Sequence, residues 1–207
     1  MSRYIGPSIK ITRRLGPLFG LTKKVPVKRT DPPGQHGKKK NEQLDKKSEY
    51  AKRLEEKQKL KFYYGLTERQ LIRYVKEARR QKGSTGQILL QLIEMRLDNV
   101  LFRLHMAPTL AAARQLINHG HIIVNKNVVS IPSYQCQVND LIVVKPKDVS
   151  KKLVLTHLQN ASTSEIPTHL EIDKDELKAK VVSLVDKIWF GLNLNELLVV
   201  EYYSRKI

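Results

Sequence analysis

Apolar residues recur at helical spacing through the middle of the chain. Leu71 and Val75 are four residues apart, and so are Leu89 and Ile93. Such periodicity is typical of helices with one face in a core. The pattern predicts helices over about 48–64, from Thr67 onward, from Ser84 onward, around 97–104, from Thr109 to Gly120 and over 149–159.

Residues at the ends of these segments support the same boundaries. TERQ at 67–70 and STGQ at 84–87 are capping boxes, in which the first and fourth side chains satisfy backbone N–H groups. Gly65 is expected to end a helix in the left-handed conformation, and Gly120 is expected to stop a later helix. Thr109 is expected to cap the helix that Gly120 ends.

Short apolar runs after residue 120 predict strands. Ile122–Val124 and Val128–Val129 flank Lys126-Asn127, which is the pattern of a β-hairpin. A further buried strand is expected over Leu141–Val144, after a turn at Asn139-Asp140. Two helices that lead into these strands predict a small α-to-β unit.

The remaining segments show less regularity. Prolines and glycines interrupt residues 1–43, which predicts an irregular, extended arm that orders against a partner. Residues 160–175 contain Pro167 and are expected to form a linker. The segment from Asn195 to Lys206 predicts a helical turn or loop followed by a strand.

Positive charge is concentrated in the first part of the chain. Residues 1–82 hold 24 Lys and Arg against 8 Asp and Glu, a net charge of +16, whereas residues 83–207 hold 14 against 12, a net of +2. A basic segment of this kind binds phosphates with little sequence selectivity and with strong dependence on salt. The expected partner is therefore RNA. The 207 residues suffice for one large domain or two small ones.

Other sequence features argue against several classes of protein and of binding site. Cys136 is the one cysteine, so neither an intrachain disulfide nor a Cys-based zinc site is expected. No apolar run reaches membrane-spanning length, and the N-terminal residues lack an apolar signal core or a long organellar presequence. No P-loop and no HExxH motif occurs. We expect no membrane, small-molecule substrate, cofactor or metal.

Several motifs in order carry a resemblance to a known family. They are RRLG at 13–16, PPGQHG at 32–37, SEY at 48–50, EEKQK at 55–59, YGLTERQ at 64–70, RLDN at 96–99, ARQL at 113–116, NHGH at 118–121 and EYYSR at 201–205. On these motifs the chain resembles the ribosomal protein S-four family over nearly its whole length. One motif alone would not be specific.

The resemblance implies an α+β fold in two parts. A mainly helical basic domain with an extended N-terminal arm comprises residues 1–94 and is completed by 176–207. A small RNA-binding module of two helices and a small β-sheet is inserted at 95–157. Residues 158–175 link the two parts.

The resemblance also implies a binding function without catalysis. The protein would be a structural constituent of the small ribosomal subunit that binds a multi-helix junction in the 5′ domain of small-subunit rRNA and nucleates assembly. Its implied partners include ribosomal protein S-five, in a contact associated with decoding accuracy, and other small-subunit proteins. The sequences GSTG at 83–86 and LVVE at 198–201 are most similar to those of plastid and cyanobacterial members. We expect the chloroplast stroma as its location, with a bacterial cytoplasm as the alternative.

The chain departs from the family pattern in three places. It lacks the N-terminal cysteines that bind zinc in many bacterial members, so no zinc is expected. The usual glycine between the two helices of the module is replaced near His105. The usual Asn-Gly turn is Asn125-Lys126-Asn127, and the hairpin is still expected because Asn tolerates positive φ.

Donor side chains are the expected RNA contacts, and Arg96 and Arg114 are the strongest candidates in the module because a planar guanidinium bridges phosphate oxygens. The alternative is a surface ion pair, such as Arg96 with Asp98 or Glu94. The full expected set is Arg3, Arg13, Arg14, Lys23, Lys24, His36, Tyr50, Arg53, Lys57, Arg69, Arg73, Arg96, Arg114, Asn118, His119, His121 and Lys126.

Second interpretations stay open for some residues. His119 and His121 flank Gly120, where a backbone can approach a phosphate closely, but both also fit solvent-facing turn histidines. Tyr63 fits half-buried packing better than base stacking. Asp98 lies in RLD, which is also how pseudouridine synthases present a catalytic Asp. An amphipathic helix follows it here, so we expect Asp98 to orient an arginine or stabilise the helix.

Two rival functions remain. An RNA-modifying enzyme that uses the same module would need a catalytic second domain, and the remaining residues do not accommodate one. A free RNA chaperone or translational regulator with the same fold cannot be separated from the ribosomal role by sequence. Co-sedimentation with ribosomal subunits would separate them.

Overall fold

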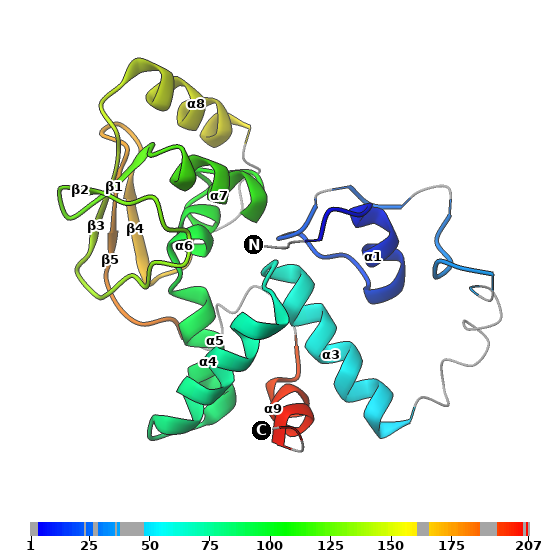
Figure 1. Cartoon of the computed structure of the whole chain (residues 1–207). Helices are drawn as coiled ribbons and strands as arrows, with labels where there is room; N and C mark the ends of the chain where they lie inside the picture. The colour runs from blue at the N-terminus through cyan, green and yellow to red at the C-terminus, as the bar shows by residue number, and fades with distance from the viewer. Residues whose placement is uncertain are drawn as a thin grey trace. The chain divides into compact units, whose positions relative to one another are not determined.

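A computed structural model describes residues 4–22, 24–26, 29–35, 37, 48–160, 166–186, 194–204 and 206. The chain forms two compact units (Figure 1). The first comprises Met1–Leu90 with Gly191–Ile207, and the second comprises Gln91–Phe190. The second unit is therefore an insertion into the first. Helix α5 (Thr85–Glu94) begins in the first unit and ends in the second.

The regular secondary structure in the described part of the first unit is helical. In addition to the start of α5, the helices are α1 (Ser8–Leu15), α3 (Glu49–Tyr63), α4 (Glu68–Arg80) and α9 (Glu196–Ser204). Leu60, Leu71 and Val75 are completely buried in this unit. The aromatic rings of Tyr64 and Tyr203 join them in the core.

The turn between α3 and α4 is formed by local hydrogen bonds. Gly65 has φ +57°, and the N–H of Leu66 donates to the Lys61 carbonyl at 2.9 Å, which closes the end of α3. Thr67 and Gln70 then form a capping box at the start of α4. The predicted stop at Gly65 and the predicted capping box are both confirmed.

The C-terminal segment is a helix, so the prediction of a strand there is wrong. Val199, Tyr202 and Tyr203 are buried at helical spacing, and α9 packs against α3. Glu201 of α9 accepts a hydrogen bond from Nε of Arg53 at 2.6 Å. β-Branched and aromatic residues favour strands only weakly, and the packing of this apolar face decides otherwise.

We expected the N-terminal arm to be irregular throughout. It instead contains helix α1, which occupies Ser8–Leu15. Pro7 precedes the helix, and Gly16 follows it with φ +86°. These helix breakers therefore bound a helix instead of preventing one. Ile11 and Leu15 bury one side of it.

The second unit combines helices with one small sheet, which confirms the mixed α+β class. The helices are α6 (Leu97–Arg103), α7 (Leu110–Asn118) and α8 (Asp148–Gln159). The strands are β1 (Ile122–Val124), β2 (Asn127–Val128), β3 (Leu141–Val144), β4 (Leu170–Asp173) and β5 (Lys178–Val181). They form an antiparallel sheet in the order β2-β1-β3-β5-β4.

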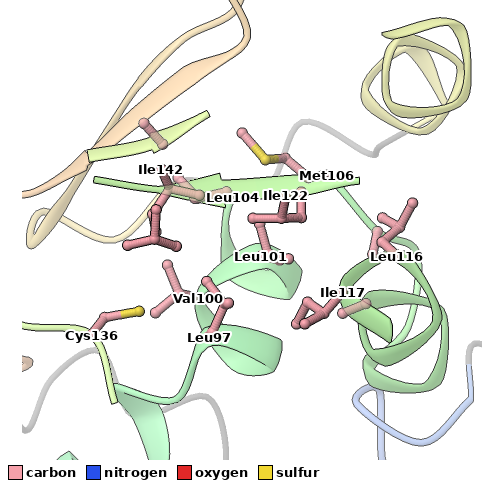
Figure 2. Close-up of a cluster of buried hydrophobic side chains, with 14 of the residues drawn as sticks. Leu97, Val100, Leu101, Leu104, Met106, Leu116, Ile117, Ile122, Cys136 and Ile142 are labelled. Carbon is pink, nitrogen blue, oxygen red and sulfur yellow. The ribbon is translucent and has the colours of Figure 1, made fainter. Parts of the chain in front are cut away.

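The core of the second unit lies between these helices and the sheet. Figure 2 shows side chains of α6 pointing toward those of α7 and of strands β1 and β3. The labelled residues are Leu97, Val100, Leu101, Leu104, Met106, Leu116, Ile117, Ile122, Cys136 and Ile142. Removing this apolar surface from water stabilises the unit, at roughly 25 cal/mol per Å².

Strands β4 and β5 extend the sheet beyond the elements that the sequence predicted. Leu170 and Val181 are buried and paired across the two strands. Residues 158–175, which we expected to be a linker, therefore contain a strand. The alternation of buried and exposed positions is only four residues long in each strand and is surrounded by charges, so it gave a weak signal.

The β1–β2 hairpin forms without a glycine in its turn. Asn125 and Lys126 have φ +49° and +73°, the signs of a type I′ turn. The Asn125 side chain donates to Oδ1 of Asp140 at 2.7 Å and accepts from the N–H of Leu141 at 3.0 Å. The hairpin that we expected to form is confirmed, with Asn127 in the strand instead of the turn.

Candidate nucleic-acid interface

Helix α4 carries a row of cations on the side opposite its buried face. Arg69, Arg73, Lys76 and Arg80 follow at intervals of four, three and four residues, and all four are exposed. This spacing places them on one side of a helix over about 16 Å. Buried residues occupy the other side, namely Leu71, Tyr74, Val75 and Ala78.

An open hollow of about 480 Å³ follows this row of cations. Ile72 and Glu77 complete its lining. Among the ion pairs of the described residues, none joins a carboxylate to any of the four cations. Four cations on one helix face, with no carboxylate partner among the described residues, attract a phosphate backbone.

A buried carboxylate joins two arginines in the second unit. Arg96 donates from Nε to Oδ1 of Asp98 at 3.0 Å and from Nη2 to Oδ2 at 2.8 Å. Arg114, from the next helix, donates from Nε to the same Oδ2 at 2.8 Å. Asp98 is 1% exposed and Arg96 3%. The carboxylate therefore forms a bidentate pair with the residue that precedes α6 and ties α7 to the start of that helix.

These contacts give the two arginines different roles. Arg96 was predicted to contact RNA, and its burial does not support that prediction. The alternative, an ion pair with Asp98 or Glu94, is confirmed in its partner Asp98, but the pair is buried instead of lying at the surface. The Arg114 side chain is 17% exposed, so Arg114 reaches the surface while Asp98 orients it. The expected arginine-orienting role of Asp98 fits this geometry.

A second buried polar cluster lies at the start of the same unit. Glu94 is 1% exposed and accepts from Nη2 of Arg103 at 2.6 Å and from the Asn99 side chain. His169 is 2% exposed, and neither ring nitrogen has a hydrogen-bond partner among the described residues. Burial lowers the pKa of His169, and Arg103 lowers it further, while Glu94 raises it.

His119 and His121 lie together after the end of α7. Their ring centroids are 6.0 Å apart, and Nδ1 of His121 is 2.9 Å from Oγ of Ser150. Burial lowers the pKa of His121, and the positive charges of His119, Lys145 and Lys147 add to this effect. The lowered pKa favours the neutral form of the His121 ring, which can both donate and accept hydrogen bonds.

The predicted RNA contacts divide by exposure. Arg3, Lys23 and His36 lie outside the described residues. The exposed ones are Arg14, Lys24, Tyr50, Arg69, Arg73, Asn118, His119 and Lys126. The partly buried ones are Arg13, Arg53, Arg114 and His121.

Lys57, another predicted contact, is buried within the first unit. It is 4% exposed, and its Nζ lies 3.0 Å from Oε2 of Glu68. Glu68 also accepts from the Tyr203 hydroxyl at 2.6 Å. Lys57 therefore holds α3, α4 and α9 together, and this burial does not support direct contact with a phosphate.

The predicted set omitted several residues of these surfaces. Lys76 and Arg80 complete the row on α4, and their spacing from Arg73 was a signal for including them. Gln115 and His157 line a small pocket together with His119 and His121. Gln115 and His157 are far apart in sequence, so spacing gave no signal for that pairing.

Two further searches concern the described residues only. Within them, no group of three or more His, Cys, Asp or Glu side chains is arranged to hold a metal ion. No helix among them has the length and apolar character needed to cross a membrane. Cys136 is buried, and burial raises the pKa of its thiol to about 12, which makes it a poor nucleophile.

Comparisons with known proteins cover the whole chain. Residues 3–94 match the ribosomal protein S4/S9 N-terminal domain, and residues 95–142 match the S4 domain. The chain is 61% identical to the small ribosomal subunit protein uS4 of Thermosynechococcus vestitus, over 100% of both chains. It is 60% identical to uS4c of Cyanophora paradoxa, over 99% of this chain and all of that one, and 60% identical to uS4c of Porphyra purpurea over 100% of both.

The α-to-β unit and its donor-rich surfaces define an RNA-binding protein with an S4 domain. Matches of this identity over the full length leave one assignment. The chain belongs to the uS4 family of small ribosomal subunit proteins. It is thus a structural constituent of the small ribosomal subunit and not an enzyme.

Proposed function

We propose that the chain is a primary rRNA-binding protein that holds a multi-helix junction in the 5′ domain of small-subunit rRNA and nucleates subunit assembly. The observation that carries this proposal is the row of Arg69, Arg73, Lys76 and Arg80 on one face of α4. Cations at this spacing follow a phosphate backbone, and such contacts position a protein on RNA without reading its sequence.

Each unit contributes its own surface to this function. The first carries the cations of α4, and the second carries Arg114, Asn118 and His119 on or next to α7. Two linked binding surfaces make the second contact intramolecular, so modest contacts give tight binding. The family matches meet between residues 94 and 95, which supports the start of an inserted module at residue 95. Strands β4 and β5 belong to the sheet of the second unit, so the module extends beyond residue 157.

The proposal includes partners and location. The chain contacts ribosomal protein S-five and, through that contact, contributes to translational accuracy. It works in ribosomes of the chloroplast stroma, which is supported by relatives named uS4c. A subunit structure and misreading assays with and without the S-five contact test the first statement, and fractionation of the source cells tests the second.

Salt-dependent binding tests the rRNA assignment. The purified chain and an Arg73→Gln/Lys76→Gln variant are titrated with 5′-domain rRNA and with an unrelated structured RNA of equal length. We expect the wild type to prefer the 5′ domain. The variant should bind more weakly at every salt concentration, and its salt slope should fall by about one per lost phosphate contact.

A matched control is Lys174→Gln, an exposed lysine in the turn between β4 and β5. The affinity of this variant for 5′-domain rRNA should remain within about twofold of the wild-type affinity, because a single exposed charge outside the α4 row contributes little. Equal wild-type affinity for both RNAs would contradict the assignment. Hydroxyl-radical footprints scattered over the 5′ domain, instead of converging on one junction, would contradict the junction model.

A further inference from the structure

We propose that a small pocket between α7 and α8 receives one unstacked nucleobase of the bound RNA. The inference rests on the RNA-binding function proposed above. The pocket has a volume of about 160 Å³. A cavity of about 150 Å³ accommodates a benzene ring, so this pocket has the size for one planar ring. Its lining consists of Ala112, Gln115, Leu116, His119, His121, Leu153 and His157.

The lining has the chemistry of a base site. Ala112, Leu116 and Leu153 supply apolar contact surface, and three imidazoles supply flat rings on which a base can stack. The Gln115 amide offers both donors and an acceptor, as the edge of a base requires. None of the described lining residues is Lys or Arg. A bare phosphate would therefore find no guanidinium or ammonium inside the pocket.

Two of the three rings are held in place by hydrogen bonds from other elements. Nδ1 of His157 donates to the Met106 carbonyl at 3.0 Å, which fixes the orientation of this ring. Nδ1 of His121 is paired with Oγ of Ser150, which is 1% exposed. A ligand thus meets rings whose orientation is already fixed, which lowers the entropic cost of binding.

Positive charge lies beside the pocket. Lys145 and Lys147 are close enough to His121 to lower its pKa, after the larger effect of burial. Lys147 is exposed at the start of α8, and Lys145 is partly buried. A base inside the pocket would place its phosphodiester near these two ammonium groups. The apolar and imidazole lining and the two nearby ammonium groups therefore match the two parts of one nucleotide.

A filling substitution tests the pocket. Leu153→Trp puts a bulky ring at the pocket, whereas Leu155→Trp puts it on another part of α8 with similar exposure, 40% against 38%. We expect Leu153→Trp to raise the Kd for 5′-domain rRNA about tenfold, because base stacking contributes on the order of 1–3 kcal/mol per base. The salt slope should stay unchanged, since no phosphate contact is lost. Leu155→Trp should change the Kd less than twofold.

A second variant, Gln115→Ala, removes a lining amide without adding bulk and should also weaken binding at an unchanged slope. In the full chain, imidazole NMR signals of His119, His121 and His157 are then followed with adenosine, uridine or inorganic phosphate. Saturable shifts with nucleosides, absent in Leu153→Trp, support the proposal.

Two results overturn the base site. One is a response to phosphate and not to nucleosides. The other is no response together with equal affinities of the two tryptophan variants. A different result would contradict the proposed rRNA-binding function itself, namely wild-type binding to 5′-domain rRNA that is no tighter than binding to unrelated RNA.

Discussion

Arg114 donates from Nε to Oδ2 of Asp98 at 2.8 Å, so a carboxylate that is 1% exposed orients an arginine at the surface. The same carboxylate neutralises Arg96, which is itself buried. Removing one partner of a buried pair leaves an uncompensated charge.

Asp98→Ala is therefore expected to lower the free energy of unfolding by about 3–5 kcal/mol, measured by urea denaturation. Asp175→Asn, at an exposed carboxylate in the β4–β5 turn, is the control and should change it by less than about 0.5 kcal/mol. A loss below about 1 kcal/mol in Asp98→Ala would show that the cluster is not structurally important.

The two arginines should respond differently to substitution. Arg114→Ala is expected to weaken rRNA binding about tenfold and to lower the salt slope by about one, because a phosphate contact is lost. Arg96→Ala is expected to reduce stability by about 3 kcal/mol, because it leaves Asp98 without its bidentate partner. Unfolding curves and RNA titrations on both variants measure the contrast. If Arg96→Ala lowers the salt slope more than Arg114→Ala does, then Arg96 and not Arg114 makes the phosphate contact.

Two equivalent helix ends allow a matched test of backbone strain. His105 follows α6 with φ +59°, and Gly120 follows α7 with φ +70°. In each case a residue in the left-handed conformation closes the helix, and the next residue donates a backbone hydrogen bond into the last turn. The N–H of Met106 donates to the Leu101 carbonyl, and the N–H of His121 donates to the Leu116 carbonyl.

His105→Gly should raise the free energy of unfolding by about 0.5–1 kcal/mol, since glycine adopts this φ without a steric cost. Gly120→Ala should lower it by about 1 kcal/mol. A Cβ at Gly120 would meet Val128 Cγ1 at 3.5 Å, an ordinary contact, so the φ alone sets the cost. Changes of the same sign in the two variants would contradict the strain argument.

His169 should make stability depend on pH. Its folded pKa lies below the unfolded value near 6.5, chiefly because it is buried. The unfolded chain therefore binds more protons than the folded chain below pH 6.5, and stability falls as pH falls from 6.5 through the folded pKa.

His169→Leu should reduce that slope by up to one proton, which is about 1.4 kcal/mol per pH unit. It should also preserve or raise stability at pH 7, because neither nitrogen of the native ring has a hydrogen-bond partner among the described residues. Urea unfolding from pH 5 to 8 measures both effects. His119→Gln, at an exposed histidine, is the control, and an equal change of slope in both variants would exclude His169 as the cause.

Local signals in the chain predicted most helices correctly. The capping box at Thr67 and the left-handed residue at Gly65 bound their helices through hydrogen bonds made within a few residues. The family resemblance, carried by nine motifs in order, predicted the α+β class and the membership in the uS4 family. Such features depend on residue type and spacing, which a sequence shows directly.

Residue type and spacing predicted the RNA-binding residues only in part. Exposed cations on α4 follow from helical spacing, because a buried face implies an exposed one. The burial of Lys57 and Arg96 does not follow from spacing, since each depends on a carboxylate that folding places beside it. The prediction that these two cations contact RNA rested on residue type and on the resemblance, and their burial does not support it.

The amino-acid pattern alone settled the charge asymmetry and the helices between residues 48 and 160, and its motifs indicated the family. Folding settled that the last segment is α9 and not a strand, that β4 and β5 widen the sheet, and that Gln115 and Leu153 line one pocket. The physical reason is the range of the interactions. Caps and periodicity act within one or two turns, whereas burial, strand pairing and ion pairs join residues that are distant in sequence and compete with local preference.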